Sequence, residues 1–246
     1  MPDTPLTILY RDTHYVAINK PSGLLVHRST LDRHETRFAV QLLRDQIGMQ
    51  VSPVHRLDRG TSGVLLFALN KDALIAASQC FESGTVEKHY RAIVRGWPEE
   101  AGAIDHPLTR IYDDAEFRPE QVSEAQAALT RYTRLARIEL PFSVDRYASS
   151  RYAYLALYPV TGRRHQLRRH LKHIAHPIIG DATYGKGRHN RFFAEHFGAN
   201  HLLLSCTRLR LTHPLTGEAL DVQTNLPDAF ERVLRDDRWC HDIQVM

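Results

Sequence analysis

The sequence is poor in cysteine. Its three cysteines, Cys80, Cys206 and Cys240, are odd in number and show no CxxC spacing. A disulfide framework and a thiolate zinc site both need paired or clustered cysteines, so neither is expected. A chain of this kind fits a reducing compartment, and we expect the protein in the cytoplasm.

Long apolar segments are also missing. The N-terminus has no apolar stretch behind a basic start, and no run elsewhere approaches the ~18 apolar residues of a membrane-spanning helix. We therefore expect no secretory leader and no membrane association. With 43% hydrophobic and 24% charged residues among 246, the composition excludes disordered and fibrous classes.

Nucleotide-binding and metal-binding motifs are absent as well. There is no GxxxxGK[ST] loop and no GxGxxG followed by an acidic residue. His170, His173 and His176 invite a metal interpretation, but residues three apart on a helix drift by about 60° per step, and neither a carboxylate nor a thiolate is near. We expect neither a cofactor nor a metal.

Lysine is scarce among the basic residues. Only 5 of the 32 are lysines, the rest are arginines, and the net charge is +4. The planar guanidinium of arginine binds phosphate through paired hydrogen bonds and stacks on bases better than the ammonium of lysine does, which favours a nucleic-acid partner. Codon bias in a GC-rich genome would give the same ratio, so the placement of the arginines has to decide.

The apolar patterns predict short strands interspersed with helices. Residues 36–47 have the spacing of a helix, 63–69 form a continuous apolar run typical of a central strand, and 88–96 alternate like a strand with one buried face. We expect an α+β fold with a mixed, mostly antiparallel central sheet and flanking helices. A single catalytic domain over 1–246 is expected, with 97–126 as a peripheral excursion that contains a short helix near 122–128.

One carboxylate stands between two arginines in "HRLDRGTSG". Arg56 and Arg59 should lower the pKa of Asp58, and an ionised carboxylate is what a nucleophile or a base requires. Gly60 and Gly63 permit a sharp turn that would present Asp58 beside the apolar strand that follows. Most turn aspartates form ion pairs and do no chemistry, so this motif alone leaves both roles open.

The segment "TGRRHQLRRHLKH" predicts a helix that begins near residues 161–162 and carries a cationic stripe. Arg164, Arg168 and Lys172 share one face, and no acidic residue occurs between Asp145 and Asp181. Like charges on a helix repel one another unless an anion offsets them. RNA phosphates or a buried aspartate would do so, and we favour nucleic acid over a solvated face.

Five segments resemble, in the same order, the motifs of the RluA-type pseudouridine synthases. They are "NKPSGLLVH" (19–27), "HRLDRGTSG" (55–63), "KHYRAIVRG" (88–96), "TGRRHQLRRHLKHIAHPIIGDATYG" (161–185) and "LTHPLTGE" (211–218). The resemblance implies the family's catalytic fold without a separate N-terminal RNA-binding domain. It also implies a cofactor-free isomerase that converts a uridine in RNA to pseudouridine.

The resemblance also implies roles for single residues. Asp58 matches the catalytic aspartate, Tyr90 the tyrosine that stacks on the target uracil, and Arg168 the arginine that pairs with the aspartate. Whether Asp58 attacks as a nucleophile or removes a ribose proton stays open. We expect RNA contacts from the basic and polar residues around these motifs, namely Arg56, Arg59, Arg163, Arg164, His165, Gln166, Arg169 and Lys172.

Three further segments resemble the branch of the family that modifies the uridine at position 65 of tRNA. They are residues 27–35, 146–152 and 188–198. We therefore expect tRNA as the substrate, no required protein partner and a monomer. Two alternatives remain: a ribosomal RNA substrate, and a non-catalytic RNA chaperone. One departure is that Ser205 and Cys206 stand where relatives commonly have His-Ala.

Overall fold

The chain forms two compact units. The structure is a computed structural model that describes residues 5–27, 35–111 and 124–242. The first unit comprises Met1–Lys88, Thr109–Glu124 and Cys206–Asn225, and the second comprises His89–Leu108, Ala125–Ser205 and Leu226–Met246. The first unit is therefore assembled from segments that are far apart in the sequence, with most of the second unit between them.

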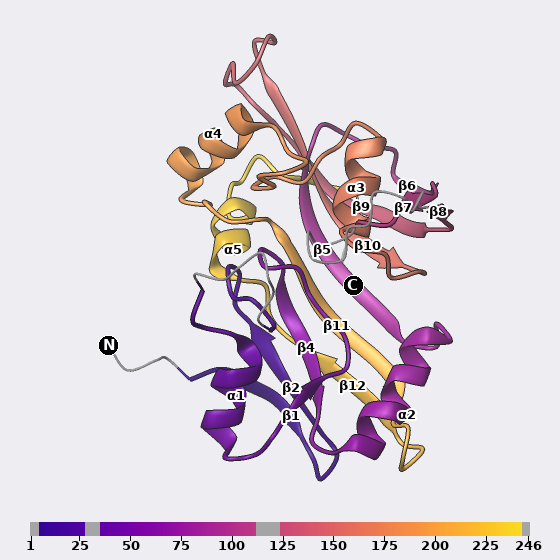
Figure 1. The fold of residues 1–246 in the computed structure, drawn as a ribbon. Coiled ribbons are helices and arrows are strands. Elements are labelled where there is room, and N and C mark those ends of the chain that lie inside the picture. The colour runs from indigo at the N-terminus through magenta and orange to yellow at the C-terminus, as the bar shows by residue number, and fades with distance from the viewer. Residues whose placement is uncertain (1–4, 28–34, 112–123, 243–246) are drawn as a thin grey trace. The chain divides into compact units, whose positions relative to one another are not determined.

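The first unit contains a sheet whose strands are neighbours in the order β1, β2, β4, β11 (Figure 1). β3 pairs with β4 and β12 pairs with β11, and the register of β1 with β2, β2 with β4, β3 with β4 and β11 with β12 is antiparallel. The strands are β1 (Thr7–Arg11), β2 (Tyr15–Lys20), β3 (Ser52–Pro53), β4 (Ser62–Ala68), β11 (Leu204–Thr212) and β12 (Ala219–Gln223). Every residue of β4 is buried, which confirms the predicted central strand.

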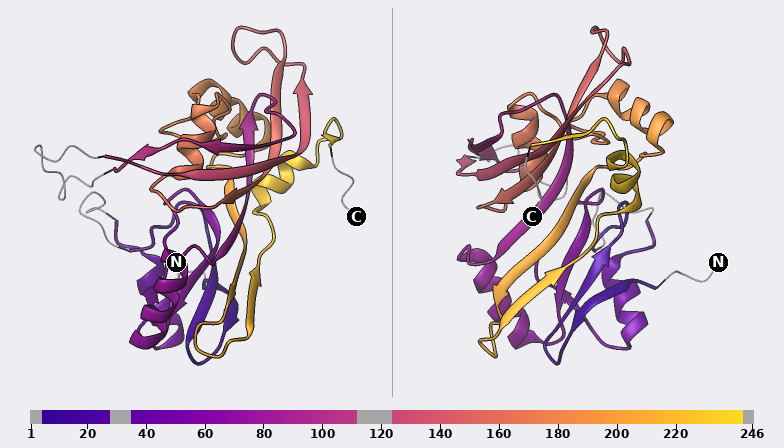
Figure 2. Two further views of the ribbon diagram at one scale, coloured as in Figure 1. Left: turned by 90° about the vertical axis from the view of Figure 1, so that its right-hand side faces the viewer. Right: turned by 180° about the vertical axis from the view of Figure 1, so that it is seen from behind.

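Helices α1 (Ala39–Ile47) and α2 (Lys71–Glu82) lie on the same face of this sheet (Figure 2). α1 ends at Gly48, whose φ of 68° is the left-handed conformation that glycine adopts readily, so the predicted end is confirmed. The N-cap of α2 is Asn70, whose side-chain oxygen accepts the N–H of Ala73 at 2.9 Å.

A buried histidine near the end of the first unit's sequence contacts an aspartate near its beginning. His213 lies 3.0 Å from Asp12 (Nε2 to Oδ2). Its Nδ1 accepts the backbone N–H groups of Leu215 and Thr216 at 3.2 and 3.0 Å. Because Nδ1 is an acceptor, the ring proton is on Nε2 and is donated to Asp12. The turn after β11 is thereby fastened to the turn between β1 and β2.

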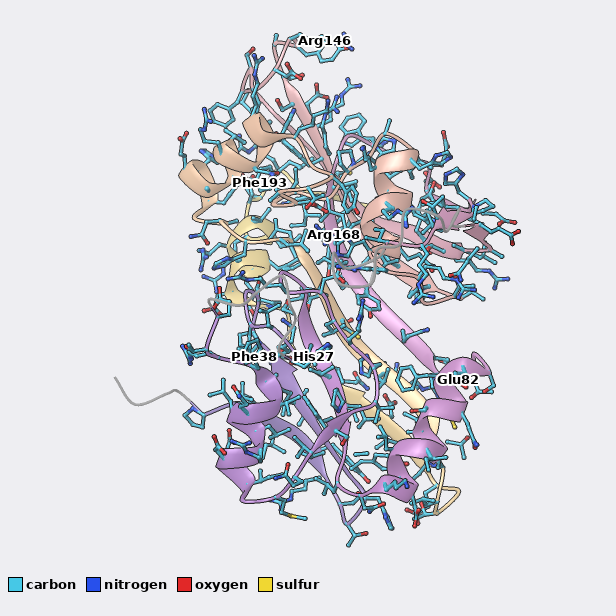
Figure 3. All side chains as sticks on the ribbon, viewed as in Figure 1. His27, Phe38, Glu82, Arg146, Arg168 and Phe193 are labelled. Atoms are coloured by element: carbon cyan, nitrogen blue, oxygen red, sulfur yellow. The ribbon has the colours of Figure 1, made fainter. Side chains whose placement is uncertain are left out.

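The second unit contains strands that are neighbours in the order β5, β10, β9, β13, with β6 paired to β9. These pairs are antiparallel: β5 with β10, β10 with β9, β9 with β13, and β6 with β9. The strands are β5 (Glu87–Arg95), β6 (Ala101–Asp105), β9 (Leu129–Leu140), β10 (Ser150–Pro159) and β13 (Cys240–His241). β9 and β10 form a long hairpin, and Arg146 lies at its tip (Figures 1 and 3).

Three helices accompany these strands: α3 (Gln166–His173), α4 (Gly187–Phe197) and α5 (Asp228–Leu234). The register of β10 on β9 shifts between Tyr154 and Leu155. On one side of this irregularity Thr130 bonds to side chains of α3, and on the other side Ile138 joins the core formed with α4 and α5. The irregularity separates the stretch of β9 that contacts α3 from the stretch that belongs to this core.

The predicted fold class is confirmed: the chain is α+β with a mostly antiparallel sheet. Within the expected excursion, β6 is a strand paired to β9, and residues 112–123 lie outside the described residues. The predicted short helix is wrong for residues 124–128, because β8 (Ala125–Gln126) pairs with β7 (Leu108–Thr109). Among the described residues, no helix has the length and apolar composition needed to cross a membrane.

Candidate active site

Two loops of the first unit are bonded to each other beside Asp58. The loop after β2 donates from the backbone N–H of Gly23 to the carbonyl of Arg59 at 2.8 Å, and from Ser22 Oγ to the carbonyl of Gly60 at 2.7 Å. The carbonyl of Asp58 itself accepts the N–H of Thr61 at 3.0 Å. The backbone from Asp58 to Gly60 is therefore held by hydrogen bonds at each of its three carbonyls.

A fully buried lysine lies beneath these loops. Lys20 Nζ donates to the carbonyls of Pro21, Leu24 and Arg59 at 3.0, 2.7 and 3.1 Å. Three carbonyl acceptors match the three N–H donors of an ammonium group. Burial lowers the pKa of Lys20 to about 7, although the charge of Asp58 opposes this shift. Sequence reasoning missed Lys20, although a lysine that ends an apolar strand directly before Pro-Ser-Gly was a usable signal.

Replacing Lys20 by Met is expected to lower the free energy of unfolding by about 3 kcal/mol at pH 7, because three carbonyls lose the donor that they share. Urea unfolding measures the change. Lys71→Met at an exposed position is the matched control and should change stability by less than about 0.5 kcal/mol. Equal stability of the two variants would contradict the assigned role of Lys20.

Wild type and Lys20→Met should also differ in how the free energy of unfolding depends on pH. The unfolded chain holds the Lys20 proton up to its ordinary pKa of 10.5, whereas the folded protein releases it near 7. The cost of charging Lys20 is thus fully present below about pH 7 and is relieved as the pH rises towards 10.5. Wild type should therefore gain stability relative to Lys20→Met over that interval.

Gly63 at the start of β4 permits a close approach of two backbones. Its φ is 106°, and a Cβ atom built on it would lie 2.0 Å from the carbonyl oxygen of Cys206. The sequence suggested that Gly63 shapes the turn that presents Asp58. The structure adds a second reason, since β11 is the neighbour of β4 and leaves no room for a side chain.

Tyr90 lies on β5 in the second unit. It is 9% exposed and opposes Leu157 of β10 in the antiparallel register. The sequence predicted one buried face for this strand, and this is wrong near its end: Ala92 and the neighbouring Ile93 are both completely buried, Ile93 in the core with α4 and α5. A strand that is covered on both faces loses the alternation on which the prediction depended.

Arg168, labelled in Figure 3, belongs to α3. It forms a two-pronged ion pair with Asp181. Its Nε donates to Oδ2 at 2.7 Å and its Nη2 to Oδ1 at 2.9 Å, and the two side chains are 10% and 0% exposed. Burial raises the pKa of Asp181, but bonds from Arg168 and from two backbone N–H groups outweigh it and leave the pKa below its ordinary value. Sequence reasoning missed Asp181.

An aromatic ring covers the guanidinium of Arg168. The ring centre of Tyr184 lies 5.0 Å from Arg168 Cζ and 5.8 Å from Lys172 Nζ, distances at which a cation is attracted to the ring face. The hydroxyl of Tyr184 is bonded to His165 Nδ1 at 3.0 Å. Three residues predicted to act on RNA therefore gather around Tyr184 in the second unit.

The amide of Gln166 is bonded within the protein on both its nitrogen and its oxygen, and a contact of Gln166 with RNA stays a prediction. Gln166 is 4% exposed, and its Nε2 donates to the carbonyl of Leu129 and to Thr130 Oγ1, both at 3.0 Å. Its Oε1 accepts from Thr161 Oγ1 at 2.7 Å and from the N–H of Arg163 at 2.9 Å. Gln166 joins α3 to β9, and α3 begins at this residue, later than the predicted start at residues 161–162.

The remaining predicted RNA-binding residues differ in exposure. Those with exposed side chains are Arg56, Arg59, Arg163 and Lys172, and those that are half-buried are Arg164, His165 and Arg169. Arg59 also pairs with Glu35, and Arg163 Nε donates to the carbonyl of Ala127 at 3.1 Å. Arg56, Asp58 and Arg59 belong to the first unit, and the others belong to the second.

The positions where relatives commonly have His-Ala are fully buried here. Ser205 and Cys206 have no exposed surface, and Ser205 Oγ has no hydrogen-bond partner among the described residues.

Comparisons with known proteins agree with these motifs. A family profile described as RNA pseudouridylate synthase matches residues 14–173. A tRNA pseudouridine synthase C from Vibrio cholerae is 48% identical over 98% of this chain and 99% of its own length. A protein of the same description from Haemophilus ducreyi is 50% identical over 95% and 96%.

The fold is also that of solved structures. Human RNA Pseudouridylate Synthase Domain Containing 1 superposes with a TM-score of 0.72 at 28% identity, over 100% of this chain and 93% of its own. Human RNA Pseudouridylate Synthase Domain Containing 4 gives 0.70 at 28% identity, over 95% and 93%. The resemblance of the five motifs is thereby confirmed over nearly the whole sequence. The chain therefore belongs to the RNA pseudouridylate synthase family of isomerases.

Proposed function

We propose that this protein isomerises a uridine of tRNA, at position 65, to pseudouridine. The observation that carries the proposal is the nearly full-length identity, 48% over 98% of the chain, to a protein described as tRNA pseudouridine synthase C. The full length matters, because the match includes the segments of this chain outside the five motifs. A ribosomal RNA substrate is the alternative, and it is not favoured by these relatives.

The reaction is a rearrangement in which no atom is gained or lost. The bond from N1 of uracil to the ribose breaks, the base turns, and C5 bonds to the same ribose carbon. C5 then loses its proton and N1 takes up a proton, so the composition is unchanged. Such chemistry calls for an ionised carboxylate, a ring that holds the base and a site that excludes water. Asp58 would serve as a nucleophile or as a base, since both roles need the same ionised group.

The other predicted residues take supporting roles in this proposal. Tyr90 stacks on the uracil, and the pairing of Arg168 with Asp58 stays a prediction. The basic side chains hold the RNA backbone through charge-assisted bonds to phosphate, which fix position and carry no sequence information. This part of the proposal applies to Arg56, Arg59, Arg163, Arg164, His165, Arg169 and Lys172. A cytoplasmic location and a monomeric state also stay predictions.

Mapping the product tests the substrate. The purified protein is incubated with unmodified tRNA and ribosomal RNA, pseudouridine is tagged with a mass label, and nuclease fragments are weighed. We expect one tagged residue, at position 65 of tRNA, and none in ribosomal RNA. Product in ribosomal RNA alone would favour the alternative substrate, and RNA binding without product from either would favour a chaperone.

A further inference from the structure

We propose that Asp181 is a positioning residue that orients the guanidinium of Arg168 for the isomerisation. The proposal rests on the function proposed above. It concerns only contacts within the second unit, where Arg168 of α3 meets the loop that follows Ile179. Asp181 would not touch the substrate; it would act through Arg168.

The ion pair fixes the plane of the guanidinium. Two parallel hydrogen bonds, at 2.7 Å from Nε and 2.9 Å from Nη2, prevent rotation about the end of the Arg168 side chain. The ring of Tyr184 lies over the same group. A long side chain that would otherwise sample many rotamers is thus held in one of them.

The carboxylate of Asp181 is itself held in place. Its Oδ1 accepts the backbone N–H groups of Thr183 and Tyr184, each at 2.9 Å. Its own carbonyl accepts Nδ2 of Asn190 at 2.9 Å, and Oδ1 of Asn190 accepts the N–H of Gly180 at 2.8 Å. The carboxylate that faces Arg168 is therefore held by the N–H groups of Thr183 and Tyr184, whereas the bonds of Asn190 reach only the backbone of the loop.

Two positions of this loop lie so close to other backbone atoms that they leave no room for a side chain. At Gly180, with φ of 79°, a Cβ atom would lie 2.0 Å from the carbonyl oxygen of His201. At Gly185 a Cβ atom would lie 2.3 Å from the carbonyl oxygen of Asp181. Gly180 before Asp181 and Gly185 after it thus permit a close backbone packing of the loop that larger residues would disrupt.

Charge gives a second reason for the pair. The cationic stripe of α3 includes Arg164, Arg168 and Lys172 and would repel itself without an anion nearby. Asp181 is completely buried as a side chain, and only pairing makes a buried carboxylate tolerable. The negative charge of Asp181 therefore neutralises the charge of Arg168 within the protein. Arg168 is thus the member of the stripe whose charge is compensated internally.

Replacing Asp181 by Asn keeps the size of the side chain and removes its charge. We expect kcat for pseudouridine formation to fall by about 10-fold to 100-fold, while KM for tRNA changes by less than about threefold, because small misplacements of a catalytic group affect the chemical step. Asp181→Glu, which keeps the charge but moves it by one methylene, should lower kcat in the same direction. Near-ultraviolet circular dichroism checks that both variants are folded.

Asn190→Ala is the matched control. It removes the bonds that Asn190 makes to Gly180 and Asp181 but leaves the carboxylate and the guanidinium intact. We expect a lower thermal midpoint with kcat within about twofold of wild type. If Asn190→Ala lowered kcat as much as Asp181→Asn does, Asp181 would be a structural residue of the loop and the proposal would be overturned.

A double-mutant cycle with Arg168→Lys shows whether Asp181 acts through Arg168. In the Arg168→Lys background, Asp181→Asn should lower kcat by less than about twofold, because the partner that it orients is gone. Multiplicative losses of kcat would overturn the proposal. So would a wild-type kcat in both Asp181 variants.

Failure of the proposed function is recognised separately. If wild type forms no pseudouridine in tRNA, the function proposed above is wrong whatever the variants do. In that case the double-mutant cycle is evaluated from the urea midpoints of wild type, the two single variants and the double variant. For a coupled pair, the shifts of the midpoint should be non-additive. Additive midpoints would show that Asp181 does not hold Arg168 and would overturn the inference.

Discussion

Asp58→Asn is expected to abolish pseudouridine formation, with a loss of rate of at least about 10⁴-fold, comparable to the loss of a nucleophile or general base in other enzymes. An amide cannot attack the ribose or accept its proton, so both open roles of Asp58 predict this result. The size of the side chain is unchanged, and the backbone bonds around residue 58 do not involve the carboxylate. Binding of tRNA should therefore stay within about threefold of wild type.

Single-turnover assays with labelled tRNA and filter-binding titrations measure the two quantities for Asp58. Asp45→Asn is the control, because Asp45 is an exposed aspartate of α1 in the same unit whose side chain is 66% accessible. It should leave both rate and binding unchanged. Full activity of Asp58→Asn would refute the assignment, and equal losses of rate and binding would indicate a role in holding RNA instead.

Gly63→Ala is expected to have the largest effect on folding. A Cβ atom cannot exist 2.0 Å from the carbonyl oxygen of Cys206, and the positive φ of 106° is itself unfavourable for alanine. Either β4 and β11 separate or the backbone of Gly63 changes conformation. A loss of more than about 4 kcal/mol in the free energy of unfolding follows, which is large enough to leave much of the protein unfolded at 37 °C.

Gly48→Ala separates the two causes. Gly48 also has a positive φ, 68°, but nothing lies within 4 Å of the position of its Cβ. It should therefore cost only about 1 kcal/mol, the backbone penalty alone. Thermal unfolding of both variants measures the difference. Similar midpoints would mean that the contact with Cys206 relaxes without cost.

Regular elements could be predicted where one physical signal dominated. The strand β4 was predicted from an unbroken apolar run, and all of its residues are buried. The end of α1 was predicted from Gly48, which adopts the left-handed conformation for which glycine is suited. Both signals are local, so they need no knowledge of what the elements pack against.

Other elements lacked a local signal. No helix was predicted after residue 185, yet α4 begins at Gly187. Its cap is Lys186, without a side-chain bond, and its first turn has no acidic residue, so the usual markers of a helix start are missing. Aromatic residues such as Phe193 pack α4 against the core, and this packing is non-local.

The functional motifs were found, but their internal partners were not. Asp181 and Lys20 make contacts at long sequence separation, and Lys20 and the carbonyl of Arg59 are 39 positions apart. Gln166 was assigned to RNA because its neighbours are basic, whereas its side chain reaches β9. A sequence pattern shows the face of a helix on which a residue lies, but not which strand will meet that face.

The bond between His213 and Asp12 spans 201 positions of the sequence. During synthesis the first strands leave the ribosome long before β11 and β12, and the second unit is translated between them. The N-terminal segment must therefore wait, with the edge of β4 uncovered, until nearly the whole protein has been made. Nascent chains stalled before residue 204 should be more sensitive to proteolysis in residues 5–88 than chains that have emerged completely.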